Sequence, residues 1–399
     1  MRLTRVIHPV GQGGFYTETL INGDQKINIV YDCGGFDNKG EKKMQKYLEC
    51  YLSKSQQKMQ IEAVFISHFH ADHINGLQYL LDHAEVKYLF IPQMTEGVFL
   101  EELFSNHSFS GSHSSVTPFL TQLYQDDHYG EGEHATKIIR VDYSNGNIIP
   151  EEFSNNAFPN ETNEFGAWDW ISQKIVNLDA LETKILSPST ILYFQKWCYI
   201  PFNLKVEPEK ADKLKEEFRK QFQAEPTIGN LSSLLEKDGI GKCAKIYKKV
   251  FGENKINHTS MTLFSGTLEK TLRNRCKCLP ENECYHHCDC IIPYRYCCNP
   301  NILYTGDFEP DKNVECMSSF YGKYWKKIAS IQVPHHGSAN NYDPELYEYP
   351  IRGIVSVGND NTYHHPDIDT LVNIQSEGCR PVIVTEDKSS MRIFQYEIL

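Results

Sequence analysis

The sequence predicts an α/β protein whose strands and helices alternate along the chain and pack in layers. Short apolar runs rich in β-branched residues alternate with longer helical runs over the first ninety residues. The same alternation returns from residue 258 to the C-terminus. Strand–loop–helix order of this kind is typical of helices layered on a sheet. The 399 residues suffice for one large domain with insertions or for two ordinary domains.

In the N-terminal part, each expected strand ends in a turn that contains polar residues. Residues 27–31 form an apolar strand that ends at Asp32-Cys33-Gly34-Gly35, where the glycines permit a sharp turn. Residues 61–66 form a buried strand that runs directly into Ser67 and His68. The other elements expected here are a helix over 41–56, a helix over 74–83 and a strand over 86–91.

The long middle segment has weaker periodicity. Two runs in it, 207–222 and 239–251, are predicted to be exposed helices with many charged residues. We therefore expect residues 96–251 to form a partly helical insertion or cap outside the central sheets, within a domain built from 1–95 and 252–399. An aromatic run at 193–199 is expected to pack this insertion on the sheet, with base stacking as the alternative. The strands expected after it are 260–265, 301–305, 328–333, 353–357 and 381–385.

Composition favours a soluble protein of the cytoplasm. No stretch approaches the ~18–20 consecutive apolar residues that span a bilayer, and the N-terminus lacks the apolar core of a signal peptide. We therefore expect no membrane association. The net charge of −12 argues against a large nonspecific nucleic-acid surface. It does not exclude a nuclease, because metal ions in a cleft would supply positive charge locally.

One short run carries most of the chemistry: His68-Phe69-His70-Ala71-Asp72-His73, between a buried strand and a helix. Imidazole and carboxylate groups are the ligands that zinc prefers, with manganese or iron as alternatives. In extended backbone, His68 and His70 point the same way. Asp72 and His73 then turn with the chain toward a second metal ion. Four ligand-type side chains in six positions predict a two-metal site.

This run resembles the His-x-His-x-Asp-His motif of the metallo-β-lactamase superfamily of hydrolases. Further runs resemble a narrower branch, typified by the hydrolase domain of the DNA-uptake protein ComEC and by phosphocholine esterases. They are Val10-Gly11-Gln12-Gly13, Asn257-x-x-Ser260, Val333-Pro334-His335-His336-Gly337-Ser338, and Val357-Gly358 with His365-Pro366. Two other runs, Tyr31-Asp32-Cys33-Gly34 and Thr305-Gly306-Asp307, resemble motifs of the superfamily as a whole. The resemblance covers about residues 6–92 and 256–396 and implies a four-layer αβ/βα sandwich.

Two positions depart from the pattern of that branch. Gly14-Phe15 stands where the branch carries an acidic residue, and His364-His365 is a doubled histidine where one is usual. Both positions lie near the expected substrate edge, so they bear on the identity of the substrate.

The resemblance implies a metal-binding role for each residue that matches the motif. His68 and His70 would hold one metal, Asp72 and His73 would hold the other, and Asp307 would bridge the two.

The resemblance does not decide which residues provide the remaining metal ligands. One of His335 and His336 would complete the second metal. His258 is either the third ligand of the first metal or a loop histidine. The residues to which the resemblance gives catalytic roles are Asp72, Asp307, His336, His365 and Ser338.

Such a site implies a dinuclear-metal hydrolase. Two divalent metals about 3.5–4 Å apart can share a hydroxide and lower its pKa enough for attack at neutral pH. Asp72 would orient that hydroxide, while His365, Ser338 and the histidine of the 335–336 pair that binds no metal would contact phosphate or protonate the leaving oxygen. The branch favours a phosphodiesterase or nuclease, with a nucleic acid, a nucleotide or a small phosphodiester as substrate. The alternatives are hydrolysis of a carboxylic ester, thioester or lactone on the same metals, and a catalytically muted scaffold that binds a partner.

A second cluster of ligand-type residues lies within 276–298. It holds seven of the thirteen cysteines and two histidines, namely Cys276, Cys278, Cys284, His286, His287, Cys288, Cys290, Cys297 and Cys298. The run is too long for a bare turn and too short for its own apolar core, so we expect a projection folded around one structural zinc. Disulfide-linked or oxidation-sensing thiols and a loose loop are the alternatives.

Overall fold

The fold is described from a computed structural model of the chain. It describes residues 1–36, 40–53, 57–109, 116–144, 185–188, 190–194, 196–205, 210–227, 239–252, 260–267, 275–276, 299–311, 313–362 and 364–398.

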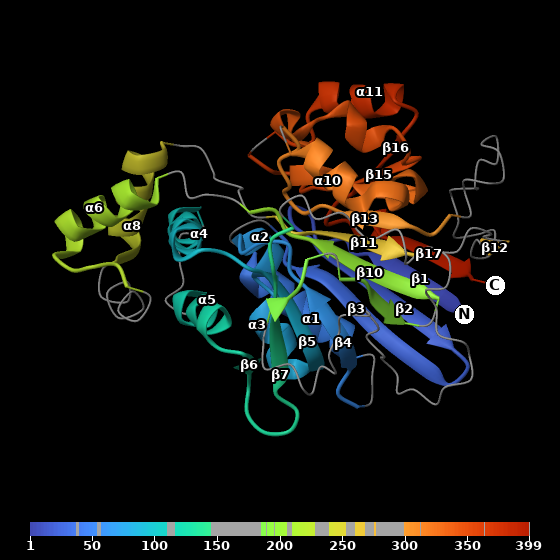
Figure 1. Cartoon of the computed structure of the whole chain (residues 1–399), viewed down its shortest axis with the longest axis horizontal. Helices are drawn as coiled ribbons and strands as arrows, with labels where there is room; N and C mark the ends of the chain where they lie inside the picture. The colour runs from blue at the N-terminus through green and yellow to red at the C-terminus, as the bar shows by residue number, and fades with distance from the viewer. Residues whose placement is uncertain are drawn as a thin grey trace.

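The described strands form two sheets, the larger of which contains the N-terminal strands. In hydrogen-bonded order this first sheet runs β12 (Arg275–Cys276), β17 (Arg392–Glu397), β1 (Arg2–Ile7), β2 (Phe15–Asn22), β3 (Gln25–Cys33), β4 (Gln60–Phe65), β5 (Glu85–Pro92), β7 (Thr136–Val141) and β6 (His128–Tyr129), and β8 (Ile185–Leu186) pairs with β7. Strands β3, β4, β5 and β7 are parallel, whereas β1 pairs with β2 and β17 in antiparallel fashion. The two ends of the chain therefore lie side by side (Figure 1).

The second sheet holds the C-terminal strands. Its order is β16 (Arg380–Val384), β15 (Arg352–Ser356), β14 (Ser330–Gln332), β13 (Ile302–Tyr304), β11 (Thr262–Gly266), β10 (Trp197–Phe202) and β9 (Leu192–Phe194). Strands β13 to β16 are parallel, so their carboxyl ends lie along the same edge of the sheet.

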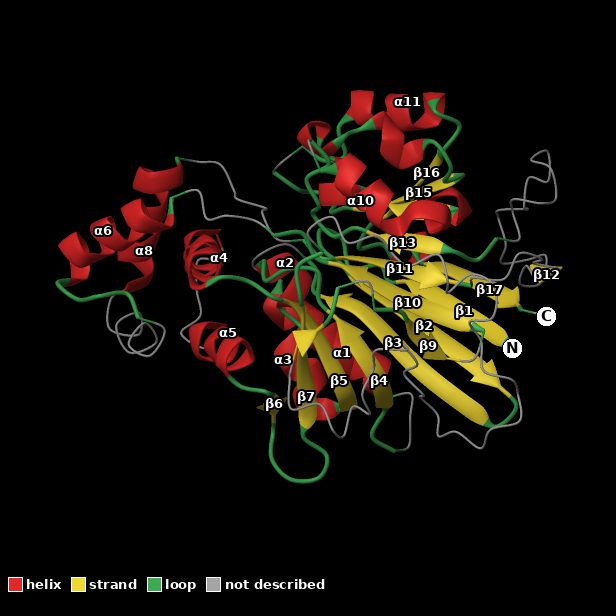
Figure 2. Ribbon diagram, in the orientation of Figure 1, coloured by secondary structure: helices red, strands yellow, loops and turns green. Residues whose placement is uncertain are grey.

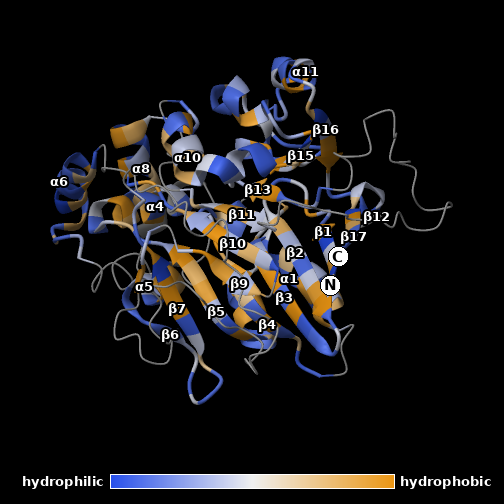
Figure 3. Ribbon diagram, turned by 45° about the vertical axis from the view of Figure 1, so that its right-hand side comes forward, coloured by the Kyte–Doolittle hydropathy of each residue, from blue (hydrophilic) through white to orange (hydrophobic). Residues whose placement is uncertain are grey.

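The two sheets pack face to face, and helices cover both outer faces (Figure 2). The first sheet is covered by α1 (Glu41–Leu52), α2 (Ala71–Ile74) and α3 (Leu77–His83), and the second by α10 (Val314–Tyr321) and α11 (Ile368–Ser376). Alternation along β5 shows the layering: Tyr88 and Phe90 pack between the sheets, whereas Leu89 and Ile91 pack under the helices. Figure 3 shows apolar residues gathered along the strands. This arrangement confirms the α/β class and the four-layer sandwich.

One polar network crosses the apolar layer between the sheets. The buried carboxylate of Glu18 on β2 forms a 2.7 Å ion pair with Arg5 on β1. From the second sheet, the same carboxylate accepts hydrogen bonds from Tyr199 at 2.8 Å, Ser265 at 2.7 Å and Tyr304 at 2.9 Å. Because every partner is buried, these bonds fix how the second sheet lies on the first.

The middle segment differs from the expectation that it stays outside the central sheets. Strands β6, β7 and β8 extend the first sheet, and β9 and β10 extend the second, so that expectation is wrong. The aromatic run at 193–199 provides strand residues, and Trp197 and Tyr199 are fully buried between the sheets. Both side chains are therefore inaccessible for base stacking. These strands were missed because each is a run of six residues or fewer, flanked by polar sequence without clear periodicity.

The helices of the middle segment pack beside the first sheet. They are α4 (Glu96–Phe109), α5 (Val116–Gln125), α6 (Ala211–Phe222) and α8 (Gly239–Phe251). The apolar side chains of α4, α6 and α8 join the same cluster as those of α1 and α3, and Figure 1 shows α4 between the sheets and the α6–α8 pair. The division into 1–95, 96–251 and 252–399 stays a prediction.

The helix expected over 74–83 is interrupted. The structure has α2 from Ala71 to Ile74 and α3 from Leu77, with a break at Gly76. A Cβ atom at Gly76 would lie 2.7 Å from Met44 Cγ, so glycine permits the close approach of α1. Among the described residues, no helix is long and apolar enough to cross a bilayer.

Candidate metal centre

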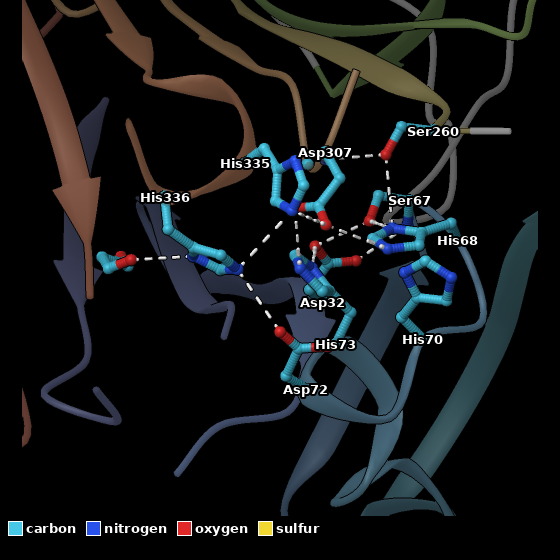
Figure 4. A network of polar contacts seen from close by, with 12 residues as sticks. Asp32, Ser67, His68, His70, Asp72, His73, Ser260, Asp307, His335 and His336 are labelled. Carbon is cyan, nitrogen blue, oxygen red and sulfur yellow. Dashed lines mark hydrogen bonds and ion pairs between the residues drawn. The ribbon is translucent and has the colours of Figure 1, made fainter. Parts of the chain in front are cut away.

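The residues of the His-x-His-x-Asp-His run and those that follow β13 and β14 meet at one edge of the paired sheets. The run lies directly after β4 and forms the start of α2. Asp307 follows β13, and His335 and His336 follow β14. Because the carboxyl ends of parallel strands lie at the same edge, side chains distant in sequence come together there (Figure 4).

Two groups of ligand-type atoms result. His68, His70 and Asp307 form the first, and Asp72, His73 and His336 form the second; within each group the atoms lie within 4.8 Å of one another, and all six residues are buried.

The separations within and between these groups suit metal ligation. His68 Nε2 lies 3.6 Å from Asp307 Oδ2, and His336 Nε2 lies 3.4 Å from Asp72 Oδ2. Two donor atoms that each lie ~2.0–2.2 Å from a tetrahedral zinc are roughly 3.3–3.6 Å apart. These pairs are thus spaced as ligands of one ion.

The unsatisfied atoms also fit a metal. Nε2 of His68 and Nε2 of His336 are buried and make no hydrogen bond to any described residue. A buried polar atom left unpaired costs about 1–3 kcal/mol, and one divalent ion in each group would satisfy both nitrogens.

Asp32 contacts His73 on the side of the ring that faces away from the two ligand groups. Its carboxylate accepts a 2.8 Å hydrogen bond from His73 Nδ1 and further bonds from the backbone N–H and hydroxyl of Ser67, at 2.7 and 2.9 Å. Nε2 of His73 faces the site, 3.1 Å from Asp307 Oδ1, and because Nδ1 carries a proton, Nε2 is the nitrogen that would offer its lone pair to a metal. The sequence placed Asp32 in a turn and in a run that resembles the family, but assigned it no role in the site. Its position at the carboxyl end of a parallel strand was the signal for a role in the site.

His68 and His336 are oriented in the same way. The Ser67 hydroxyl donates to Asp32, so it accepts from His68 Nδ1 at 2.9 Å. Nδ1 of His336 donates to the backbone carbonyl of Ser356 at 2.8 Å. Both rings therefore turn Nε2 inward. Ser260 also contacts His68 Nδ1 at 3.2 Å, and its hydroxyl accepts from the backbone N–H of Asp307 at 2.8 Å.

His335 occupies a different position from His336. Its Nδ1 contacts Asn341 Oδ1 at 3.0 Å, and its Nε2 lies 3.8 Å from Asp307 Oδ2. Its side chain is 19% exposed, against 3% for His336. Both residues have positive φ, 47° and 57°, in the tight turn after β14. The turn thus directs His336 into the second ligand group and His335 to the rim.

Of the residues expected to have catalytic roles, His365 and Ser338 lie near the 335–336 histidine pair. The His365 ring lies 5.4 Å from the His335 ring, edge to face, and Ser338 is buried in the turn that follows His336. His258 lies outside the described residues, as do the cysteines and histidines from Cys278 to Cys298. Cys276 lies in β12, opposite Tyr396 of β17.

A glycine-rich loop supports the ligand turn. The backbone N–H of Gly14 donates to the carbonyl of Asp72 at 3.2 Å. Gly13 has φ +132°, and a Cβ atom there would collide with that same carbonyl oxygen. The loop can approach Asp72 this closely because no side chain intervenes.

Burial and charge act together on the central ion pair. Burial alone would raise the pKa of Asp307, but His335 and His73 outweigh it and hold that pKa well below its usual range. Burial likewise lowers the pKa of His73, but the carboxylates of Asp307 and Asp32 raise it well above 6.5. Without a metal, the site is therefore stabilised by a proton on His73.

Comparisons with known proteins agree with the fold. Residues 15–136 match the family model of the metallo-beta-lactamase superfamily. No curated protein matches the chain. Among solved structures, the chain resembles the metallo-beta-lactamase fold protein YhfI from Bacillus subtilis, with a TM-score of 0.38 and 9% identity over 99% of this chain and 100% of that one. It also resembles unliganded yeast PDE1, with a TM-score of 0.33 and 10% identity over 100% of both chains.

These two structural likenesses are too distant to assign an activity. The family match, by contrast, contains the whole His68–His73 run. That run follows a strand of a two-sheet sandwich with helices on both outer faces, and it meets Asp307 and His336 from the second half of the chain. Residues 15–136 are therefore similar to the metallo-β-lactamase superfamily, and the two-sheet sandwich is the fold that this similarity implies.

Proposed function

We propose that this protein is a hydrolase that uses two divalent metal ions to cleave phosphodiester bonds. The observation that carries the proposal is the position of Asp307 between the two ligand groups. Its Oδ2 lies 3.6 Å from His68 Nε2, while its Oδ1 lies 3.1 Å from His73 Nε2. A carboxylate that turns one oxygen toward each group is suited to bridge two ions.

The donor set gives each ion a distinct group of ligands. His68 and His70 would hold the first ion, and Asp72, His73 and His336 would hold the second, with Asp307 shared. Imidazole nitrogens and carboxylate oxygens favour zinc, with manganese as the alternative. When bound, two such ions lower the pKa of a water molecule and neutralise charge that develops on a phosphoryl oxygen.

The residues of the chain supply orientation and proton transfer. Asp32, Ser67 and the carbonyl of Ser356 fix which nitrogen of each histidine faces the ions. His335 and His365 lie together at the rim, where His335 is close to Asp307 but outside the second ligand group. We assign this pair to contact with a substrate phosphate and to protonation of the leaving oxygen. Ser338 in the same turn is a further candidate.

The choice of a phosphodiester substrate rests on resemblance. The Thr305-Gly306-Asp307 and Pro334-to-Ser338 runs are similar to those of the ComEC-like branch. The same ligand set would also serve for a carboxylic ester, thioester or lactone, because the superfamily fold hosts all of these reactions.

The test is turnover of bis(p-nitrophenyl) phosphate with added zinc or manganese, set beside a thioester substrate. We expect phosphodiester hydrolysis by the wild-type protein and a loss of roughly 100-fold or more in Asp307→Ala, which removes the bridge. Thioester turnover without phosphodiester turnover would reject the proposed substrate class. Full activity of Asp307→Ala would reject the two-metal mechanism.

A further inference from the structure

Helix α4 presents an unusual set of buried polar residues to the metal site. Glu101, Glu102, Ser105 and Asn106 are 2–4% exposed, although the helix belongs to the middle segment. Glu102, Ser105 and Asn106 are spaced three and four residues apart, so they share one face of the helix. Buried polar side chains need partners, and the partners of this face lie in the His-x-His-x-Asp-His run.

All three residues contact the same short stretch of that run. Asn106 Nδ2 donates to the backbone carbonyl of Phe69 at 2.6 Å. Glu102 Oε2 lies 3.5 Å from Nε2 of His70, and Ser105 Oγ lies 3.4 Å from the same nitrogen. Helix α4 thus contacts both the backbone carbonyl of Phe69, which precedes His70, and Nε2 of the His70 ring.

The His70 ring differs from the other histidines of the two ligand groups in the nitrogen that contacts the surrounding protein. His68, His73 and His336 are each held through Nδ1, so that Nε2 faces the site. Glu102 and Ser105 contact His70 at Nε2, and we infer that Nδ1 is the nitrogen this ring offers to the site. The negative charge of Glu102, 3.5 Å from Nε2, attracts a proton to that nitrogen and so favours the tautomer in which Nδ1 carries the lone pair.

Glu102 itself lies behind His70 and not among the ligands. Of the described residues, the group that gathers within 4.8 Å around the first ion position contains His68, His70 and Asp307, and Glu102 is not part of it.

We propose that Glu102 is the positioning residue that makes His70 an Nδ1 ligand of the first metal, so that helix α4 of the middle segment is a working part of the metal site. This inference rests on the proposed metal-binding function. The family match spans α4 but assigns no role to it.

Zinc affinity of two matched variants provides the main test. Glu102→Ala removes the partner of His70. Glu101→Ala removes the neighbouring buried carboxylate, which instead accepts a 2.9 Å hydrogen bond from the backbone N–H of Lys210. Competition with a chromophoric chelator should show roughly 10–100-fold weaker zinc binding for Glu102→Ala and a change below about 2-fold for Glu101→Ala. Equal losses in both variants, or none in Glu102→Ala, would overturn the proposal.

Two spectroscopic measurements separate positioning from direct ligation and from loss of fold. With saturating Co²⁺, Glu102→Ala should keep the visible absorptivity of the wild-type protein, because no ligand has been removed. A changed coordination number would show that Glu102 is a ligand and would overturn the positioning role. Thermal unfolding of both variants in the metal-free state checks that α4 still folds.

The tautomer of His70 can be observed without any metal. Long-range ¹H–¹⁵N correlation spectra of the chelated protein, with His70 assigned through His70→Gln, should show the proton on Nε2 in the wild-type protein. Glu102→Ala should reduce that preference, whereas Glu101→Ala should not. A proton on Nδ1 in the wild-type protein would overturn the inference. This readout stands apart from the proposed function, which fails instead if the wild-type protein binds no metal.

Discussion

The carboxylate of Asp32 accepts a 2.8 Å hydrogen bond from Nδ1 of His73, and both side chains are completely buried beneath the metal centre. This contact joins the end of β3 to the ligand turn that follows β4. It fixes the tautomer of His73 and thus the nitrogen that the ring offers to a metal.

Replacement of Asp32 should therefore weaken metal binding. In Asp32→Asn the neutral amide no longer holds the proton on Nδ1, and we expect zinc affinity to fall roughly 10–100-fold. Asp127→Asn, which breaks a 3.2 Å ion pair with Arg140 away from the site, is the matched control. Chelator competition on both proteins measures the effect, and unchanged affinity in Asp32→Asn would contradict the assigned role.

The two adjacent histidines should separate into a ligand and a catalytic group. His336→Ala removes a buried member of the second ligand group, so the number of bound metal ions per chain should fall by about one relative to the wild-type protein. His335→Ala should keep both ions and lose mainly kcat, because His335 lies at the rim beside His365. Metal analysis paired with steady-state kinetics distinguishes the two. Loss of metal in His335→Ala, with full occupancy in His336→Ala, would reverse the assignment.

The stabilising effect of zinc should grow with pH. The raised pKa of His73 means that its proton stabilises the metal-free protein fully below 6.5, and this stability is lost as pH rises through the folded-state pKa. Zinc binding requires that proton to leave, so it is favoured as pH rises. The difference in Tm between zinc-loaded and chelated protein should be larger at about pH 8 than at about pH 6. A difference that shrinks over this range would count against ligation by His73.

The Glu18 network should contribute strongly to stability without affecting the chemistry. Glu18→Ala leaves the buried guanidinium of Arg5 without its carboxylate, and breaking a buried pair in this way costs about 3–5 kcal/mol. Glu62→Ala removes the partner of the half-exposed Lys87 and should cost less than about 1 kcal/mol. Denaturant unfolding of both variants provides the comparison. Similar losses in the two would show that the network does not hold the sheets together.

The cysteine-rich run at 276–298 predicts an additional metal. The active-site proposal accounts for two ions, so metal analysis of the purified protein should find about three zinc ions per chain if the run holds one structural site. Asp307→Ala should lower that number without abolishing it, because the cysteines are independent of Asp307. Two ions or fewer in the wild-type protein would leave the run without a structural zinc.

The sequence predicted those residues of the site that lie close together along the chain. His68, His70, Asp72 and His73 occupy one short run, so their clustering follows from backbone geometry alone. The α/β class and eight of the seventeen strands among the described residues followed from apolar runs of the expected length. Helix α8 was predicted with the bounds that the structure shows, 239–251.

The residues that support the ligands could not be found in this way. Asp32 and Glu102 belong to the site only through contacts with residues far along the chain. The run around Asp32 resembles one of the family but assigned it no role in the site, and Glu102 lies in a helix whose sequence has no clear apolar face. Strands β7 and β10 were missed for a related reason, because pairing with β5 and β11 determines their conformation more than their own sequence does.

The central claim, that two ions bridged by Asp307 carry out phosphodiester hydrolysis, is tested most directly by metal titration of the chelated protein. Hydrolysis of bis(p-nitrophenyl) phosphate should rise with added zinc or manganese and level off when two equivalents have bound at the active site, and Asp307→Ala should stay inactive throughout. Activity that levels off at one equivalent, or an Asp307→Ala variant as active as the wild-type protein, would contradict it.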